Sequence, residues 1–158
     1  MKALAEQGLT GSGVKILATG DVTDDAVLQG MGDAALNIIS SHHYSYAHSS
    51  PANKAYVKAY AALFGNDIRP NFMSVGGYDG MAAIYRVIEQ LKGKMDGAKA
   101  MAALKGMRIE SPRGPIEIDA ATRDVVQTVY IRRVEKVEGK LVNVEFDEVE
   151  NVKDPAKP

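Results

Sequence analysis

Hydrophobic positions occur along this chain in two spacings, as short runs and as helical stripes. Residues 14–18 and 35–39 are short runs of mainly aliphatic and β-branched side chains, each with one polar residue inside it, and they predict two buried strands. Between them, Thr23 can cap a short helix over residues 24–31. The acidic side chains in its first turn favour the same helix, because they interact well with the helix dipole. Residues 2–7 are typical of the last turns of a helix.

Helical spacing of apolar side chains is clearest in residues 51–64. Ser50 and the proline after it form a favourable helix start, and Gly65 ends the predicted helix. A shorter helix is expected over residues 97–104, with Asp96 as its cap. The middle of the chain therefore contains two helices with defined starts and ends.

The segment between these two helices contains a glycine-rich turn. Residues 72–75 predict a short strand, residues 76–80 (Gly-Gly-Tyr-Asp-Gly) a turn, and residues 81–91 a long helix. Such a turn can cradle a phosphate, but this one lacks the dinucleotide-binding spacing and the P-loop lysine. We expect the glycines to let Tyr78 project at a helix N-terminus, where its ring can cover a ligand.

The last third of the chain changes to strands separated by turn residues. These strands are predicted at residues 107–110, 116–118, 125–134 and 141–149. Helices and strands in this order predict an α/β fold with αβα layers. Because only two or three of the strands could lie parallel, we expect the chain to form part of a larger fold.

Composition changes this picture mainly by exclusion. The chain has 158 residues, of which 46% are apolar and 25% charged, as in one ordinary globular domain. Its formal net charge of -1 gives no field that would attract nucleic acid or an anionic membrane, so neither partner is expected. The lack of cysteine excludes disulfides, thiol catalysis and zinc-thiolate sites but leaves the compartment open.

All three histidines lie in residues 40–54, between the second predicted strand and the helix that follows it. An open α/β sheet places its ligand site at such a strand end. A metal site is one interpretation, but His42 and His43 are adjacent on an extended segment and point to opposite faces. The segment also has no carboxylate to complete a ligand set. We therefore expect polar contacts to a ligand or solvent exposure, and neither a metal nor a cofactor.

Candidate chemistry elsewhere in the chain is limited to Asp21. This acid lies between the first predicted strand and the helix cap, in a strand-to-helix loop. The sequence has no nucleophilic serine elbow, no H-E-x-x-H motif and no forced carboxylate pair, so no enzyme activity is predicted. Arg132 and Arg133 are interpreted as surface charges on a strand.

The order of these pieces resembles the C-terminal part of a type I periplasmic substrate-binding protein of the branched-chain amino acid class, which serves ATP-driven importers. The most specific matches are the helix start Pro51-Ala52-Asn53-Lys54 and the turn Gly76-Gly77-Tyr78-Asp79-Gly80. Residues 14–21 and 32–39 match in pattern. The resemblance covers residues 2 to about 149, and it implies a bilobal α/β protein with a ligand cleft between its lobes.

The resemblance also implies which residues line that cleft. Asp21 is similar by position to the family's acidic residue that pairs with a ligand ammonium group, and Tyr78 to its cleft tyrosine. His43, Tyr44 and Tyr46 would lie along the cleft where the chain crosses between lobes. Since Asp21 is shorter than the usual glutamate and the segment is rich in His and Tyr, an aromatic carboxylate competes with an amino acid as the ligand.

Organisation and partners follow from the same resemblance. Residues 1–41 would end one lobe, residues 42–134 would form the second part of the other lobe, and residues 135–158 would return as strands and a tail. The protein would be periplasmic and would deliver its solute to the membrane permease of an ABC importer. The alternative is a ligand-sensing domain of a receptor or regulator, because one fold can serve both. Self-association is expected as one way to cover unpaired cleft faces.

Overall fold

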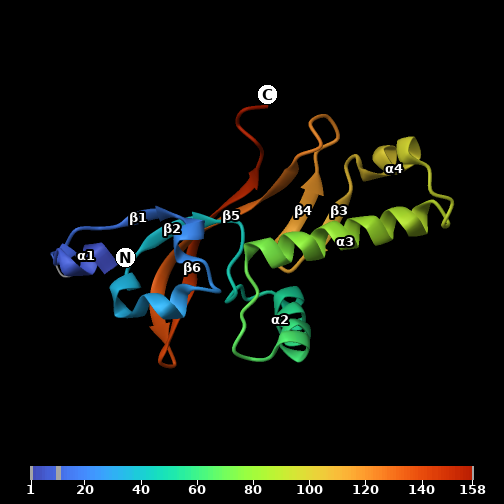
Figure 1. Cartoon of the computed structure of the whole chain (residues 1–158). Coiled ribbons are helices and arrows are strands. Elements are labelled where there is room, and N and C mark those ends of the chain that lie inside the picture. The colour runs from blue at the N-terminus through green and yellow to red at the C-terminus, as the bar shows by residue number, and fades with distance from the viewer. Residues whose placement is uncertain (1, 10–11, 158) are drawn as a thin grey trace.

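A mixed sheet runs through the computed structural model, which describes residues 2–9 and 12–157 (Figure 1). Its order is β1-β2-β5-β4-β3, with β6 paired to β5. Among the described strands, β1 and β2 are parallel and the other pairs are antiparallel. The fold is therefore α/β with flanking helices, as predicted. The strands are β1 (Leu17–Thr19), β2 (Ile39–His42), β3 (Arg108–Ser111), β4 (Gly114–Ile118), β5 (Val125–Val137) and β6 (Lys140–Val152).

Strand β5 links two groups of strands. Val125 and Val126 at its start pair with β4, whereas residues 130–133 pair with β2. Strand β6 follows β5 along most of its length, with two register shifts near the middle. We call this pair the β5–β6 ribbon. It joins an N-terminal body around β1 and β2 to a helical body around α2, α3 and the β3–β4 hairpin (Figure 1).

The N-terminal body has its own apolar core, in which residues distant in sequence meet. Leu28 and Ile38 pack with Val134 of β5 and Leu141 of β6, and all four are at most 4% exposed. Burial of one such side chain contributes about 1.5–3 kcal/mol. This core therefore ties the beginning of the chain to its end, with the short helix α1 (Lys2–Glu6) beside it.

The predicted helix over residues 24–31 is wrong. The chain instead forms two 3-10 helices, η2 (Gly20–Thr23) and η3 (Leu28–Ala35). Gly32 interrupts η3 with a φ of 61°, a left-handed conformation that a regular helix does not contain. Because η3 extends this far, the second strand begins at Ile39, about four residues later than predicted.

Two helices of the helical body are confirmed with their predicted ends. In α2 (Pro51–Phe64), the Ser50 hydroxyl accepts a hydrogen bond from a first-turn amide, and Gly65 follows with a φ of 90°. In α4 (Gly97–Leu104), the Asp96 carboxylate accepts the equivalent bond. Local capping chemistry was therefore sufficient to predict both elements.

The predicted strand at residues 72–75 and the turn at 76–80 are wrong. Both segments belong to one long helix, α3 (Phe72–Gln90). The helix begins with a capping box, in which the side chains of Asn71 and Ser74 each accept a bond from the other residue's backbone amide. This cap starts the helix before the glycines, which are tolerated inside it at a cost of about 1 kcal/mol each relative to alanine.

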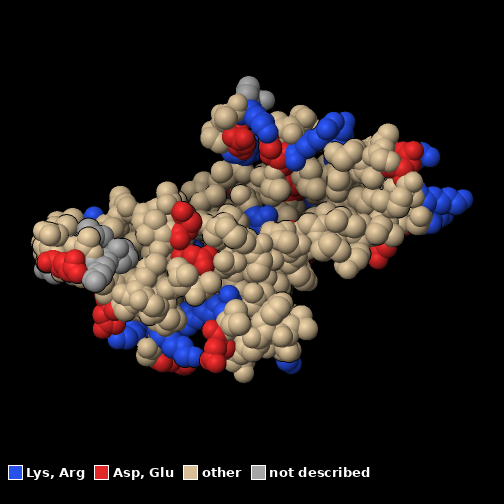
Figure 2. All heavy atoms as spheres, viewed as in Figure 1, with Lys and Arg blue, Asp and Glu red and all other residues tan. Residues whose placement is uncertain are grey.

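The helical body exposes an apolar surface along α2 and α3, and Figure 2 shows few charged side chains over this part of the molecule. No helix in the described part of the chain is long and apolar enough to cross a membrane. Self-association that covers the cleft faces stays a prediction. The large exposed side chains of this apolar surface are Leu63, Phe64, Met73, Tyr78, Met81, Ile84, Tyr85 and Ile88.

Candidate functional site

The carboxyl ends of β1 and β2 meet the first turn of α3. Gly20 follows β1, and the His42 ring at the end of β2 lies so close that a Cβ on Gly20 would be 1.9 Å from it. His42 stacks on His43 with ring centroids 4.5 Å apart, so the expectation that the two side chains point to opposite faces is wrong, because β2 ends at His42 and strand alternation does not continue to His43. The Phe72 ring meets His42 at 4.8 Å. Asp21 is near enough for its charge to act on His42. We call Asp21, His42, His43 and Phe72 the junction cluster.

Both histidines of the junction cluster are neutral at pH 7. Burial lowers the pKa of His42 to about 3, and the charges of His43 and Arg132 add to this effect. Burial likewise lowers the pKa of His43 to about 4, assisted by Arg113 and Arg132. A neutral imidazole offers one donor and one acceptor. Within the described residues His42 Nδ1 is buried and has no hydrogen-bond partner.

Asp21 supplies the negative charge of the junction cluster. Its carboxylate is exposed at the start of η2, and a hydrogen bond with the Thr19 side chain is the main reason that its pKa is lowered. Asp21 is therefore ionised at neutral pH. An ionised carboxylate accepts hydrogen bonds from an ammonium group or from a phenolic hydroxyl.

Arg132 lies directly behind the junction cluster. Its side chain is 1% exposed, so the interpretation of Arg132 as a surface charge is wrong. The guanidinium donates to the carbonyl oxygens of Tyr44 at 2.6 Å and Gly20 at 3.0 Å, and to the Ser40 hydroxyl at 3.1 Å. The neighbouring Arg133 is half-buried and lies over the Phe146 ring. Strand alternation thus places one arginine inside and the other outside.

The chain crosses between the two bodies in residues 43–49, and Asn53 of α2 organises this crossing. Its side-chain nitrogen Nδ2 donates to the carbonyl oxygens of Tyr46 and His48, each at 2.9 Å. Its side-chain oxygen accepts a bond from the Tyr44 hydroxyl at 3.0 Å. Tyr44 is 1% exposed, so within this chain it supports the crossing from the core rather than facing solvent.

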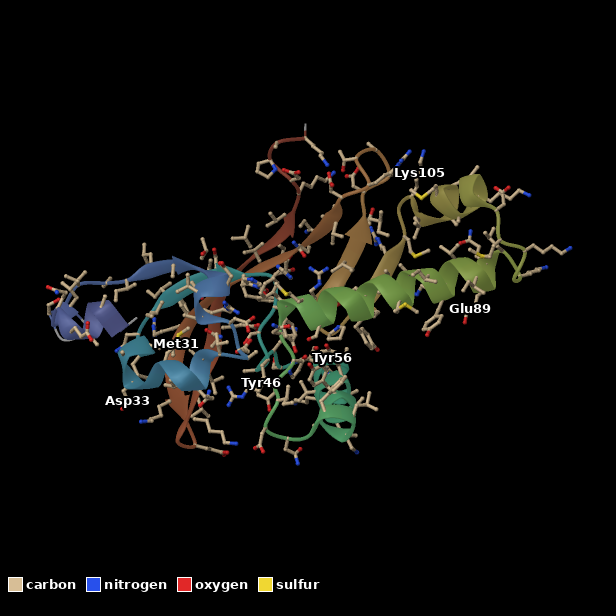
Figure 3. All side chains as sticks on the ribbon, viewed as in Figure 1. Met31, Asp33, Tyr46, Tyr56, Glu89 and Lys105 are labelled. Carbon is tan, nitrogen blue, oxygen red and sulfur yellow. The ribbon has the colours of Figure 1, made fainter. Side chains whose placement is uncertain are left out.

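Tyr46 borders a hollow that no residue of the junction cluster lines. A cavity of about 610 Å³ opens between the crossing and α2, where Lys54 and Lys58 lie one turn apart. Arg69 covers the Tyr46 ring, with its guanidinium carbon 4.8 Å from the ring centroid. Figure 3 marks Tyr46 on the crossing and Tyr56 on α2. Tyr46 therefore lies beside the candidate site rather than in it.

Tyr78 lies in the second turn of α3, not at a helix N-terminus. Its side chain is 49% exposed, and its ring centroid lies 5.0 Å from that of Tyr56. Of the five residues proposed from the sequence, the structure brings Asp21 and His43 together around His42. It places Tyr44 behind the crossing, Tyr46 beside a second cavity and Tyr78 further along α3.

Sequence reasoning missed two residues that shape the site. Phe72 was assigned to a strand, although the Asn71 and Ser74 pattern before the helix could have revealed a capping box that brings its ring to the junction. Arg132 carried no local signal, because its acceptors lie about 90 to 110 positions earlier in the chain. In the described residues no group of three or more His, Cys, Asp and Glu side chains could hold a metal ion.

Known proteins match this chain over nearly its whole length. The family model described as periplasmic binding protein matches residues 1–140. A Leu/Ile/Val-binding protein homolog 6 from Brucella abortus (strain 2308) is 42% identical over 156 residues, which are 98% of this chain and 40% of that protein. The chain thus spans about two fifths of the length of this relative.

Solved structures give the same coverage. A solute binding protein of an ABC transporter from Rhodopseudomonas palustris BisB5, in complex with 3,4-dihydroxybenzoic acid, is 53% identical with a TM-score of 0.94. The match covers all of this chain and 43% of that one. A second solute binding protein, from Rhodopseudomonas palustris HaA2 in complex with p-hydroxybenzoic acid, is 42% identical with a TM-score of 0.89, over 99% of this chain and 42% of that one.

Proposed function

This chain belongs to the periplasmic binding protein family, and on that premise we propose that it forms part of the solute-binding component of an ABC importer. We further propose that the solute is an aromatic carboxylate with a ring hydroxyl. The observation that carries this proposal is the junction cluster, where two neutral histidines, an aromatic ring and one carboxylate lie together at the point where the ends of β1 and β2 meet the start of α3.

The chemistry of the junction cluster suits such a ligand. The rings of His42, His43 and Phe72 offer faces and edges that pack against a benzene ring. Asp21 is exposed and can accept a hydrogen bond from a phenolic hydroxyl. The ligand carboxylate would then point away from Asp21, because like charges repel. Relatives with 53% and 42% identity hold ligands of this class.

A branched-chain amino acid is the second candidate ligand. Asp21 is the observation that favours it, since an exposed carboxylate at a strand end can pair with an ammonium group. The two candidates differ in which ligand group reaches Asp21. They can therefore be distinguished by using ligands that carry only one of the two groups.

The bodies on either side of the β5–β6 ribbon would act as parts of two lobes, and binding would close them around the solute. Residues up to about 41 would belong to one lobe, residues 42–134 mainly to the other, and the last strands would return to the first. Asp21 and His43 would contact the solute, Tyr44 would hold the crossing, and Tyr46 and Tyr78 would flank the cleft. No covalent step is involved.

The family implies a periplasmic location for this function, and it implies the membrane permease of the importer as the partner. A ligand-sensing role would use the same cleft, but the closed form would then be recognised by a signalling protein rather than by a permease. Transport of a labelled hydroxybenzoate, lost on deletion of the gene and restored by it, would identify the importer. A transcriptional or signalling response without uptake would identify the sensor.

Thermal unfolding with and without ligand tests the binding proposal. The ligands are 3,4-dihydroxybenzoate, 4-hydroxybenzoate, benzoate and leucine, and a ligand at 100 times its dissociation constant adds about 2.7 kcal/mol to stability. We expect the hydroxybenzoates to raise Tm and Asp21→Asn to remove most of this rise, whereas Asp67→Asn on an exposed loop leaves it intact. A rise with leucine alone favours the second candidate, and no rise with any ligand contradicts the proposal for this chain.

A further inference from the structure

Arg132 connects three segments that are far apart in the sequence. Its guanidinium bonds the carbonyl after β1, the hydroxyl of Ser40 in β2 and the carbonyl of Tyr44 in the crossing. Asp21 follows directly after Gly20, and the histidine pair lies between Ser40 and Tyr44. One buried side chain on β5 therefore fixes the backbone on both sides of the junction cluster.

We propose that Arg132 is a positioning residue for ligand binding, which holds the Gly20 and Tyr44 carbonyls so that Asp21 and the histidine pair face the same ligand. The planar guanidinium suits this task because its donors have fixed directions and reach two acceptors on different segments at once. The part of this inference that concerns ligand affinity rests on the proposed function. The part that concerns the histidine pair does not.

The charge of Arg132 is not neutralised by a direct ion pair in the described structure. Asp25, whose charge acts on it, uses its carboxylate to accept bonds from the Tyr46 amide and the Asn143 side chain. Arg132 Nε has no hydrogen-bond partner among the described residues. A buried ion of this kind is a weak source of stability, and well-packed apolar residues often serve stability better. Its position behind the histidines therefore points to a role in the site.

The histidines respond to this charge. The charged or titratable groups that act on His42 are His43, Arg132, Asp21 and Arg113, and those that act on His43 are Arg113 and Arg132. Burial is the largest reason for their low pKa values, and the two arginines act in the same direction. Arg132 thus helps to keep both imidazoles neutral, so that each ring has one acceptor nitrogen as well as one donor.

Three variants separate position from charge. Arg132→Met removes both, Arg132→Lys keeps the charge but loses the planar fork, and Arg133→Met is the matched control one position along β5, where the side chain is 40% exposed. The histidine pKa values are measured by NMR titration of the ring nitrogens without ligand. Affinity for 4-hydroxybenzoate is measured by calorimetry, and circular dichroism reports folding.

We expect Arg132→Met to raise the pKa of both histidines by roughly half a unit or more, whereas Arg133→Met leaves them unchanged. We expect Arg132→Lys to keep the low pKa values but to weaken binding of 4-hydroxybenzoate about tenfold or more, as loss of one charge-assisted bond does. If Arg132→Met fails to fold, Arg132→Lys alone decides.

Wild-type affinity in Arg132→Lys, or equal histidine shifts in Arg132→Met and Arg133→Met, would overturn the inference. If the wild type does not bind 4-hydroxybenzoate, the proposed function fails, but the ligand-free titration still decides whether Arg132 controls the histidine pair. The two failures are therefore distinguishable.

Discussion

Removal of the Asp79 carboxylate is the sharpest test of how the helical body is held together. Asp79 of α3 pairs with Arg113 of the β3–β4 turn at 2.7 Å, and both side chains are about 6–7% exposed. Arg113 also bonds Gln127 on β5, so it links the helix to the sheet. Asp79→Ala would leave the Arg113 charge buried without its counter-ion.

Loss of one partner from a buried pair costs about 3–5 kcal/mol. Domains of ordinary size have only about 5–15 kcal/mol of stability, so we expect Asp79→Ala to remove a large share of it. Urea unfolding followed by circular dichroism measures the effect. For a slope of about 2 kcal/mol per molar urea, the midpoint falls by roughly 1.5 M or more.

Two controls show whether the cost comes from the unpaired charge. The double variant Asp79→Leu with Arg113→Met removes both charges, and we expect it to recover much of the loss. Glu117→Ala breaks an exposed pair with Arg108, for which at most about 1 kcal/mol is expected. If Asp79→Ala costs no more than Glu117→Ala, the buried pair does not stabilise the helical body and the reasoning is refuted.

Three further predictions concern the site and α3. Gly20→Ala places a Cβ against the His42 ring and should abolish stabilisation by 4-hydroxybenzoate in a thermal-shift assay, whereas Gly30→Ala, which meets open space, should not. His42 and His43 bind protons near pH 6.5 in the unfolded state but only near pH 3 to 4 in the folded state, so the free energy of unfolding should fall as the pH drops from 6.5 to about 4. The fall should be less steep in His43→Gln, and an equal dependence of the unfolding free energy on pH in both proteins, measured by urea titration, would contradict this. Gly77→Ala, in the open interior of α3, should raise stability by about 0.5–1 kcal/mol, and a loss in urea unfolding would show that a Cβ is not tolerated there.

The sequence predicted those elements whose signals are local. Ser50 and Asp96 are side-chain caps, and the helices after them have the predicted ends. The α/β class also follows from the order of strands and helices. The first turn of α3 was missed because three glycines outweighed the capping box at Asn71.

Residues of the site were predictable only where a strand end implied them. Asp21 and His43 lie at the ends of β1 and β2, as the loop positions suggested. The burial of Arg132 depends on carbonyls brought to it by the pairing of β2 with β5, and no local pattern encodes that pairing. Tyr44 likewise takes its place in the core from Asn53, nine positions away on another element.

The N-terminal body is completed by strands that follow the helical body in the chain. Gln29 and Leu141 exchange hydrogen bonds across 112 positions. The core around Leu28 and Ile38 lacks its packing partners Val134 and Leu141 until β5 and β6 are synthesised. Contacts of such high sequence separation form slowly. On the ribosome, we therefore expect the helical body to fold before β5 pairs with β2. Until then the free edge of β2 is the place where the nascent chain is most exposed to misassociation.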